Sequence, residues 1–340
     1  MSARAVILPA QAEDAGEAHA LAFRIAFAAA VGLTLGELLG WDFPFLPAML
    51  AVQLLAGRGP IGVKQGVAFV GVMVVACVFA VLVAQIFVDS PLILLLVVAL
   101  VTFLAFLLLA RGQAAGVAAA FLITTAVIPL LASESMSVAY GFIHSLIAGS
   151  ALAVLLAFAA HAFFPTRLQP EPVSPLAHDE RDSVALALAN TAVLMSLVIY
   201  FMLTVSPVSI VIVLTVISIL RQPTGLGGGA AMGLIVGNLV GGLASTVAYL
   251  LVTLFPSPAF LLLVVLLSGL IFGDRIARRG ESAPIHTVGL MTFLLVLGLG
   301  LSPLPEDSGS IFIARVFDIM VACAYGIGMA SLLRSAFRAR

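Results

Sequence analysis

The sequence predicts an all-α integral membrane protein with about twelve transmembrane helices in two parallel six-helix repeats. Composition, a series of apolar runs and an internal repeat predict this fold. Of the 340 residues, 63% are hydrophobic and 9% are charged, and the mean hydropathy is +1.25. Soluble domains carry about a quarter charged residues, so the lipid bilayer is the expected solvent. No basic cluster indicates a nucleic-acid partner.

The second half of the chain repeats landmarks of the first. Ser90 begins the apolar run SPLILLLVVALVTFLAFLLLARG, and Ser257 begins the similar run SPAFLLLVVLLSGLIFGDRIARRG. Arg111 ends the first of these runs and Arg279 ends the second. The step from Ser90 to Ser257, called the repeat offset below, equals the step from Arg111 to Arg279 to within one residue. A membrane unit repeated within one chain is a common design of transporters.

Twelve apolar runs justify the twelve helices in order. They lie at 19–40, 43–57, 61–88, 91–110, 113–133, 138–164, 183–204, 207–220, 226–254, 258–274, 284–302 and 311–335. The segment between the sixth and seventh runs is polar and rich in proline, which predicts a linker. The predicted parts are a tail at 1–18, a first repeat at 19–164, the linker at 165–182, a second repeat at 183–335 and a tail at 336–340.

Cationic residues predict the orientation. Lysines and arginines in the connections follow even-numbered runs, whereas the odd connections carry acidic residues such as Asp42, Asp89 and Glu134. Because Lys and Arg stay on the cytoplasmic side, both termini are expected to be cytoplasmic, in a bacterial inner membrane. Six spans per half give the two repeats the same orientation. Arg24, within the first run, is expected to extend to the lipid headgroups.

Small residues spaced by four form a ladder in the ninth run. Its members are Gly225, Gly229, Gly233, Gly237, Gly241 and Ser245. Residues four apart share one helix face, so the ladder predicts close helix packing. A sliding or pore-lining surface is the alternative. The contact can lie within one chain or between copies, which leaves a homo-oligomer open.

Two runs are short for a bilayer and lie at matching places in the halves. The run 43–57 contains Gln53, and the run 207–220 contains Thr215. Short, proline-interrupted spans at such places indicate the binding site of a transporter, and short helices inside a thicker bundle are the alternative. Asn238, beside the glycine ladder, either joins two helices or faces the substrate.

Charged residues near the start of the last run are the predicted coupling site. Arg315 and Asp318 are one helical turn apart and can pair. Charges inside membrane spans are rare and usually functional, so Asp318 is a candidate proton carrier and Arg315 a candidate to tune it or attract an anion. A structural ion pair is the alternative. His144 is the rough counterpart of Asp318 in the first half, with a proton role or a packing role.

Motifs of enzymes do not stand out in the sequence. The stretch GLGGGAAMG lacks the lysine and hydroxyl residue that a phosphate loop needs. We find no nucleophile elbow and no metal-ligand spacing, so no enzymatic activity, cofactor or metal is expected.

The chain resembles the fusaric-acid-resistance, or aromatic acid exporter, superfamily. The resemblance rests on the arginine-led first helix RIAFAAAVGLTLGELLGW, the short second helix, the small-residue third helix and the last helix beginning ARVFDIMVACAYG. It covers 19–335 and is closest to a compact bacterial branch of uncharacterised inner-membrane proteins. Larger members carry a cytoplasmic domain, in whose place this chain has only the linker.

This resemblance implies proton-driven efflux of aromatic or other organic acids, with a periplasmic adaptor protein as partner. The preferred interpretation is therefore an inner-membrane exporter of small organic acids. The first alternative is a non-transporting membrane anchor or assembly subunit for such an adaptor. A membrane-embedded enzyme acting on lipid is the third and least favoured interpretation.

Overall fold

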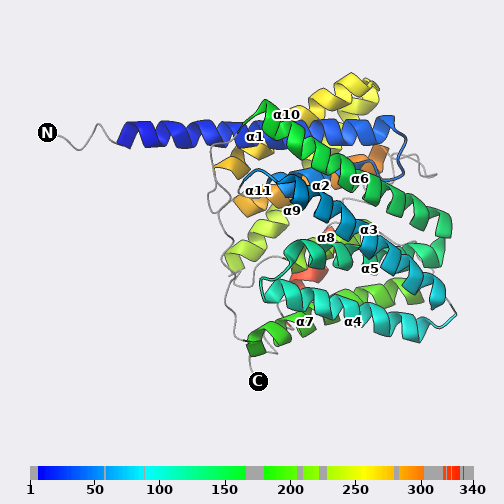
Figure 1. Cartoon of the computed structure of the whole chain (residues 1–340). Coiled ribbons are helices and arrows are strands. Elements are labelled where there is room, and N and C mark those ends of the chain that lie inside the picture. The colour runs from blue at the N-terminus through cyan, green and yellow to red at the C-terminus, as the bar shows by residue number, and fades with distance from the viewer. Residues whose placement is uncertain are drawn as a thin grey trace. The chain divides into compact units, whose positions relative to one another are not determined.

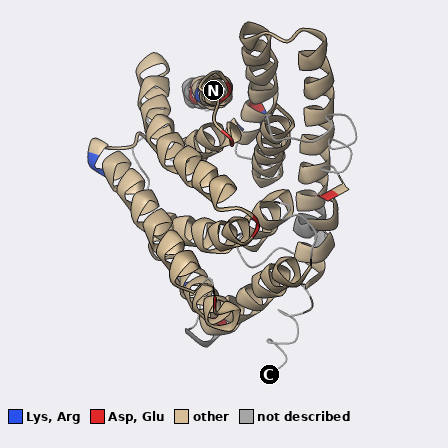
Figure 2. Ribbon diagram, turned by 90° about the vertical axis from the view of Figure 1, so that its right-hand side faces the viewer, with Lys and Arg blue, Asp and Glu red and all other residues tan. Residues whose placement is uncertain are grey.

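The protein is a multi-pass, helical membrane protein. The computed structural model describes residues 7–56, 59–87, 89–165, 180–204, 210–221, 228–278 and 283–301, together with most of 317–332 (Figure 1). Within them, nine helices are long and apolar enough to cross a membrane, and none of these residues forms a strand. Charged residues are sparse along the described ribbon (Figure 2). Many large apolar side chains are exposed, as a lipid solvent allows.

The helices lie at the places where the apolar runs predict them. They are α1 (Ile7–Leu38), α2 (Phe45–Leu55), α3 (Val63–Ile86), α4 (Pro91–Ala110), α5 (Ala115–Glu134), α6 (Met136–Phe163), α7 (Glu180–Leu203), α8 (Ile210–Leu220), α9 (Gly228–Leu254), α10 (Pro258–Ala277) and α11 (Ala283–Leu301). A shorter apolar helix follows at Met320–Met329.

Two boundaries differ from the predicted ones. Helix α1 begins at Ile7, so part of the expected tail is helical, because its alanine and glutamate residues favour a helix. Helix α7 begins at Glu180, inside the expected linker, and 166–179 lie outside the described residues.

The repeated Ser-Pro pairs begin two helices. Ser90 precedes α4 and Ser257 precedes α10, with the proline in the first turn of each helix. Proline suits this turn because its missing N–H would have no helical acceptor. The Ser257 hydroxyl also accepts a hydrogen bond from the Phe260 N–H at 3.2 Å.

The chain forms two compact units, and each unit takes helices from both halves of the sequence. Unit 1 comprises Met1–Gly66, Ala148–Pro172 and Val236–Pro303, and unit 2 comprises Val67–Ile147, Val173–Ile235 and Leu304–Arg340. In unit 1, α1 packs on α10 and α2 packs on α11. In unit 2, α7 packs on α4 and α8 packs on α5. Each unit therefore joins the first two helices of one half to the fourth and fifth helices of the other.

One contact in unit 1 and one contact in unit 2 join residues that are related by the repeat offset. In unit 1, a Cβ added at Gly269 of α10 would lie 3.2 Å from the Cβ of Ala26 in α1. In unit 2, the Thr102 hydroxyl of α4 lies 3.9 Å from the sulfur of Met195 in α7. The step from Thr102 to Gly269 equals the repeat offset, and the step from Ala26 to Met195 is two residues longer. Both contacts therefore join positions that correspond in the two halves.

We expect a disulfide to form between Ala26→Cys and Gly269→Cys in a chain whose Cys77 and Cys323 are replaced by serine. The 3.2 Å Cβ separation is close to the 3.5–4.5 Å range of disulfides, and the 2.8 Å approach of the added Cβ to the Ala26 Cα requires the two helices to move slightly apart. A protease site inserted at 166–179 then cuts the chain, and a non-reducing gel should still show both halves joined. Gly16→Cys is the matched control with Gly269→Cys, because a Cβ at Gly16 meets nothing within 4 Å. Separation of the halves in the Ala26 variant would contradict the packing of α1 on α10.

Candidate functional site

The two short helices are the centre of the candidate site. Helices α2 and α8 have 11 residues each. At about 1.5 Å per residue each spans about 16 Å, roughly half of a hydrocarbon layer. Their terminal backbone groups therefore need partners from the protein or a water-filled path.

Helix α2 is held closely against α1 by two glycines. A Cβ added at Gly36 would lie 2.5 Å from the carbonyl oxygen of Pro44, and one at Gly32 would lie 2.8 Å from the Cα of Ala48. From Gly32 to Gly36 the contact moves four residues forward along α1, and from Ala48 to Pro44 it moves four residues back along α2. The two helices therefore run antiparallel. Two further turns place Arg24 level with Ala56, which ends α2.

Arg24 is buried inside unit 1, so the expectation that it extends to the headgroups is wrong. Its side chain is 5% exposed, and its Nη2 lies 3.7 Å from a carboxylate oxygen of Glu17. Its Nε donates to the carbonyl oxygen of Ala20 at 3.2 Å. The helix dipole places partial negative charge at the end of α2, which favours a guanidinium nearby.

In unit 2, the end of α8 has a direct polar partner. The side-chain amide of Asn190, in α7, donates to the carbonyl oxygen of Leu220, the last residue of α8, at 3.2 Å. Asn190 is 4% exposed. The step from Arg24 to Asn190 matches the repeat offset to within one residue, so the first helix of each half carries a buried polar residue at the level where a short helix ends. Thr215 is buried in the middle of α8.

The last helix, which carries Asp318, contacts α8. Two turns after Asp318, Gly326 faces α8, where an added Cβ would lie 3.4 Å from Ile219 and 3.6 Å from Val216. Asp318 lies eight residues before Gly326, about 12 Å along the helix axis. Asp318 is half-buried, and Arg315 lies outside the described residues.

The last helix is joined to α7 by hydroxyl groups. The Tyr325 hydroxyl donates to the carbonyl oxygen of Val193 at 2.9 Å and is hydrogen-bonded to the Ser196 hydroxyl. Tyr325 lies two turns after Asp318, so both residues lie on one face of that helix. The face with Asp318 is therefore directed toward α7 and α8.

The glycine ladder forms a close contact between α9 and α11. A Cβ at Gly237 would lie 2.5 Å from the carbonyl oxygen of Ile285, and one at Gly241 would collide with the backbone of Gly289. Gly233 and Ser245 are also buried. Gly225 and the surroundings of Gly229 lie outside the described part of the chain.

Asn238 joins the same two helices. Its side-chain oxygen accepts a hydrogen bond from the Thr292 hydroxyl at 2.6 Å, and both residues are buried. This hydrogen bond fits the interpretation that Asn238 joins two helices. A substrate contact of Asn238 stays a prediction.

Two other predicted residues lie away from these interior contacts. Gln53 is exposed on α2, and His144 is exposed on α6. Gly149, not His144, is the α6 residue beside the start of α2, since a Cβ there would lie 3.2 Å from the Pro47 nitrogen. His144 belongs to unit 2, as Asp318 does, and its correspondence to Asp318 stays a prediction.

Several residues of this site were missed from the sequence. Each has a polar partner on a helix: Glu17 on α1, Asn190 on α8, Thr292 on α9 and Tyr325 on α7. Asn190 had a visible signal, because it is an amide inside an apolar run at the repeat offset from Arg24. The described residues include no group of three or more histidine, cysteine or acidic side chains that could hold a metal.

Comparison with known proteins gives one similarity. Residues 21–160 match a family model whose description is a protein of unknown function (DUF2955). The matched segment nearly coincides with the predicted first repeat, 19–164, and covers less than half of the chain. Neither the curated proteins nor the solved structures gave a match.

Proposed function

We propose that the protein is an inner-membrane transporter that exports small aromatic or other organic acids, driven by the proton gradient. The observation that carries the proposal is the pair of short helices at matching places in two similarly built units. A helix that ends inside the hydrocarbon layer exposes backbone groups, and transporters use such ends to bind ions and substrates. In unit 2, Asn190 donates to the end of α8, and the helix that carries Asp318 contacts α8.

An internal duplication supports the same proposal. The contact pairs of the two units are related by the repeat offset to within two residues, and the matched family segment has the length of one half. Twelve spans, with α2, α8 and the last helix as the helical parts of three of them, are consistent with the cationic connections. Each compact unit takes helices from both halves of the chain.

The resemblance of the first and last helices to aromatic acid exporters gives the substrate class. The arginine that leads the first helix is buried in unit 1, and Asp318 of the last helix faces the unit 2 interior. A periplasmic adaptor as partner rests on the resemblance alone.

Growth on organic acids tests the function. We expect cells that express the protein to tolerate higher concentrations of hydroxybenzoic or fusaric acid than cells with the empty vector. The neutral alcohol of the same ring is the control, because an acid exporter should give no protection against it. Equal tolerance of the acids with and without the protein would contradict export of this class.

A further inference from the structure

We propose that the two halves of the chain, residues 1–172 and 173–340, are two protein partners that recognise each other, and that the first half does not pair with a second copy of itself. The surface that decides this is the contact of α1 and α2 with α10 and α11 in unit 1. The inference concerns assembly of the membrane part, so it holds whether or not the protein is a transporter.

Neither half of the chain contains a complete unit. The first half contributes its beginning and its end to unit 1 and its middle, Val67–Ile147, to unit 2. The second half contributes Val236–Pro303 to unit 1 and its other segments to unit 2. The core of each unit is therefore an interface between two halves. Interfaces that resemble a domain core cut in half are typical of obligate complexes.

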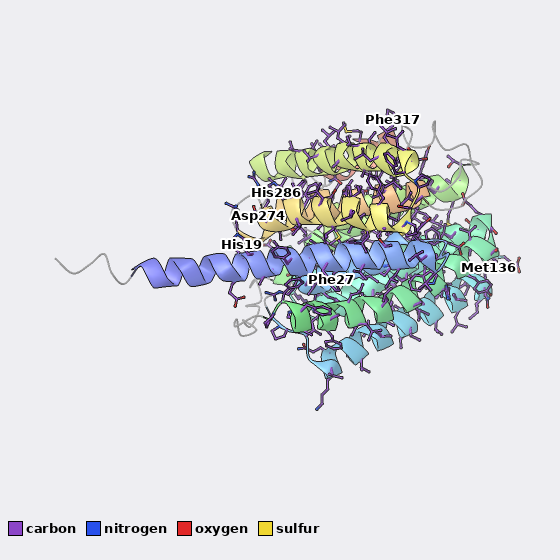
Figure 3. All side chains as sticks on the ribbon, turned by 90° about the horizontal axis from the view of Figure 1, so that it is seen from above. His19, Phe27, Met136, Asp274, His286 and Phe317 are labelled. Atoms are coloured by element: carbon purple, nitrogen blue, oxygen red, sulfur yellow. The ribbon has the colours of Figure 1, made fainter. Side chains whose placement is uncertain are left out.

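Helices α1 and α10, which lie side by side in unit 1 (Figure 3), are in backbone contact across this interface. A Cβ added at Gly269 would lie 2.8 Å from the Ala26 Cα, and one added at Gly273 would lie 3.0 Å from the carbonyl oxygen of Ala22. Glycine lets two membrane helices approach this closely because it has no side chain. A larger residue at either α10 position would have to move a helix backbone.

Gly298 makes a second close contact across the same interface, between α11 and α2. A Cβ added there would lie 2.6 Å from the Cβ of Phe45 and 3.1 Å from a methyl group of Leu33. Phe45 and Leu33 are fully buried. The second half therefore presents glycine at three positions that face the first half in unit 1.

The first half carries larger side chains at the three corresponding positions. Going back by the repeat offset from these three glycines leads to Thr102, Phe106 and Leu131. All three side chains are buried in unit 2. Thr102 lies there against the long side chain of Met195, whose sulfur is 3.9 Å from the threonine hydroxyl. The two units therefore use different side chains at corresponding contacts.

A second copy of the first half would consequently fit poorly against α1. Its own α4 would bring Thr102 and Phe106 to the backbone at Ala26 and Ala22, where glycine alone leaves room. Packed interiors have no space for such added volume, so the helices would separate and lose their other contacts. The second half does not meet this clash. Selectivity therefore comes from a steric conflict with the wrong partner as well as from a fit to the right one.

The test is co-expression of three chains: the second half, and the first half in two versions that carry different affinity tags. Either tag should recover the second half in equimolar amount and the other first half at least about tenfold less, the factor that about 1.4 kcal/mol gives. Full-length chains with the same two tags measure association between whole proteins, and this background is subtracted. Recovery of the other first half as efficiently as the second half would overturn the selectivity.

Substitutions that carry first-half residues into the second half test the surface itself. Gly269→Thr combined with Gly273→Phe should lower recovery of the second half by at least about tenfold. The matched control is Leu267→Thr combined with Ile271→Phe, which places the same residues at the same spacing on the exposed face of α10. The control should be recovered as the wild type is. Equal recovery of both variants would overturn the role of this contact.

If the separately made halves are not recovered together, the full-length protein decides. A protease site in 166–179 is cut after purification, and the halves should stay together in detergent and unfold at the temperature of the uncut chain. The cut halves should separate in the variant with Gly269→Thr and Gly273→Phe, and not in its control. Separation of the cut wild-type halves would overturn the partnership.

Discussion

Gly241→Leu is expected to prevent unit 1 from folding, whereas Gly71→Leu should be tolerated. A Cβ at Gly241 would collide with the backbone of Gly289, and neither backbone can move without separating α9 from α11. Overpacking of this kind costs about 3 kcal/mol or more when no flexible side chain can give way. A Cβ at Gly71 meets nothing within 4 Å, so leucine there adds apolar surface in a helix that already exposes it.

The alanine variants give a finer measurement of the same contact. Gly71→Ala should raise the unfolding temperature, because alanine favours a helix by up to about 1 kcal/mol over glycine. Gly241→Ala should lower it, since the clash outweighs the gain in propensity. Size-exclusion chromatography and thermal unfolding in detergent measure both pairs. A Gly241→Leu protein as monodisperse and stable as Gly71→Leu would show that α9 and α11 are not in backbone contact.

Asp318→Asn is expected to uncouple transport from the proton gradient. A proton carrier must gain and lose a proton in every cycle, which asparagine cannot do. The position suits this role, because the carboxylate is half-buried on the face toward α7 and α8. One pH unit corresponds to about 1.36 kcal/mol, so the variant should lose roughly tenfold substrate accumulation for each unit of imposed gradient.

Exchange separates loss of coupling from loss of folding. Asp318→Asn should still exchange labelled for unlabelled acid across liposomes at equal pH on both sides. Asp89→Asn, an exposed carboxylate after α3, is the matched control and should keep gradient-driven accumulation. Undiminished accumulation by Asp318→Asn would remove the coupling assignment.

Helix positions were predictable from the sequence because an apolar solvent imposes a strong pattern. Each span must be long and continuous, and each connection carries the polar, Gly and Pro residues that end it. For this reason the apolar runs predicted α2 and α8 as well as the long helices. The Ser-Pro pairs also marked where α4 and α10 begin, since within a helix proline is favoured only in the first turn.

The partners of these helices were not predictable, because hydropathy does not record which helix packs on which. The sequence predicts two successive six-helix repeats but not how their helices pack, and each compact unit mixes helices of both halves. Arg24 illustrates the consequence for the site. On an isolated helix an arginine eight residues into a span extends to the headgroups, but packing of α2 and α10 around α1 buries it beside Glu17. A role of His144 stays a prediction, and Gly149 is the α6 residue for which a contact with α2 is seen.

Flux through purified protein in liposomes tests the central claim most directly. The wild type should accumulate labelled hydroxybenzoate against its own gradient when a pH gradient is imposed, by roughly tenfold per pH unit for one proton. Collapse of the gradient with a protonophore should release the accumulated acid. Flux equal to that of protein-free liposomes across a panel of aromatic and aliphatic acids would contradict the account.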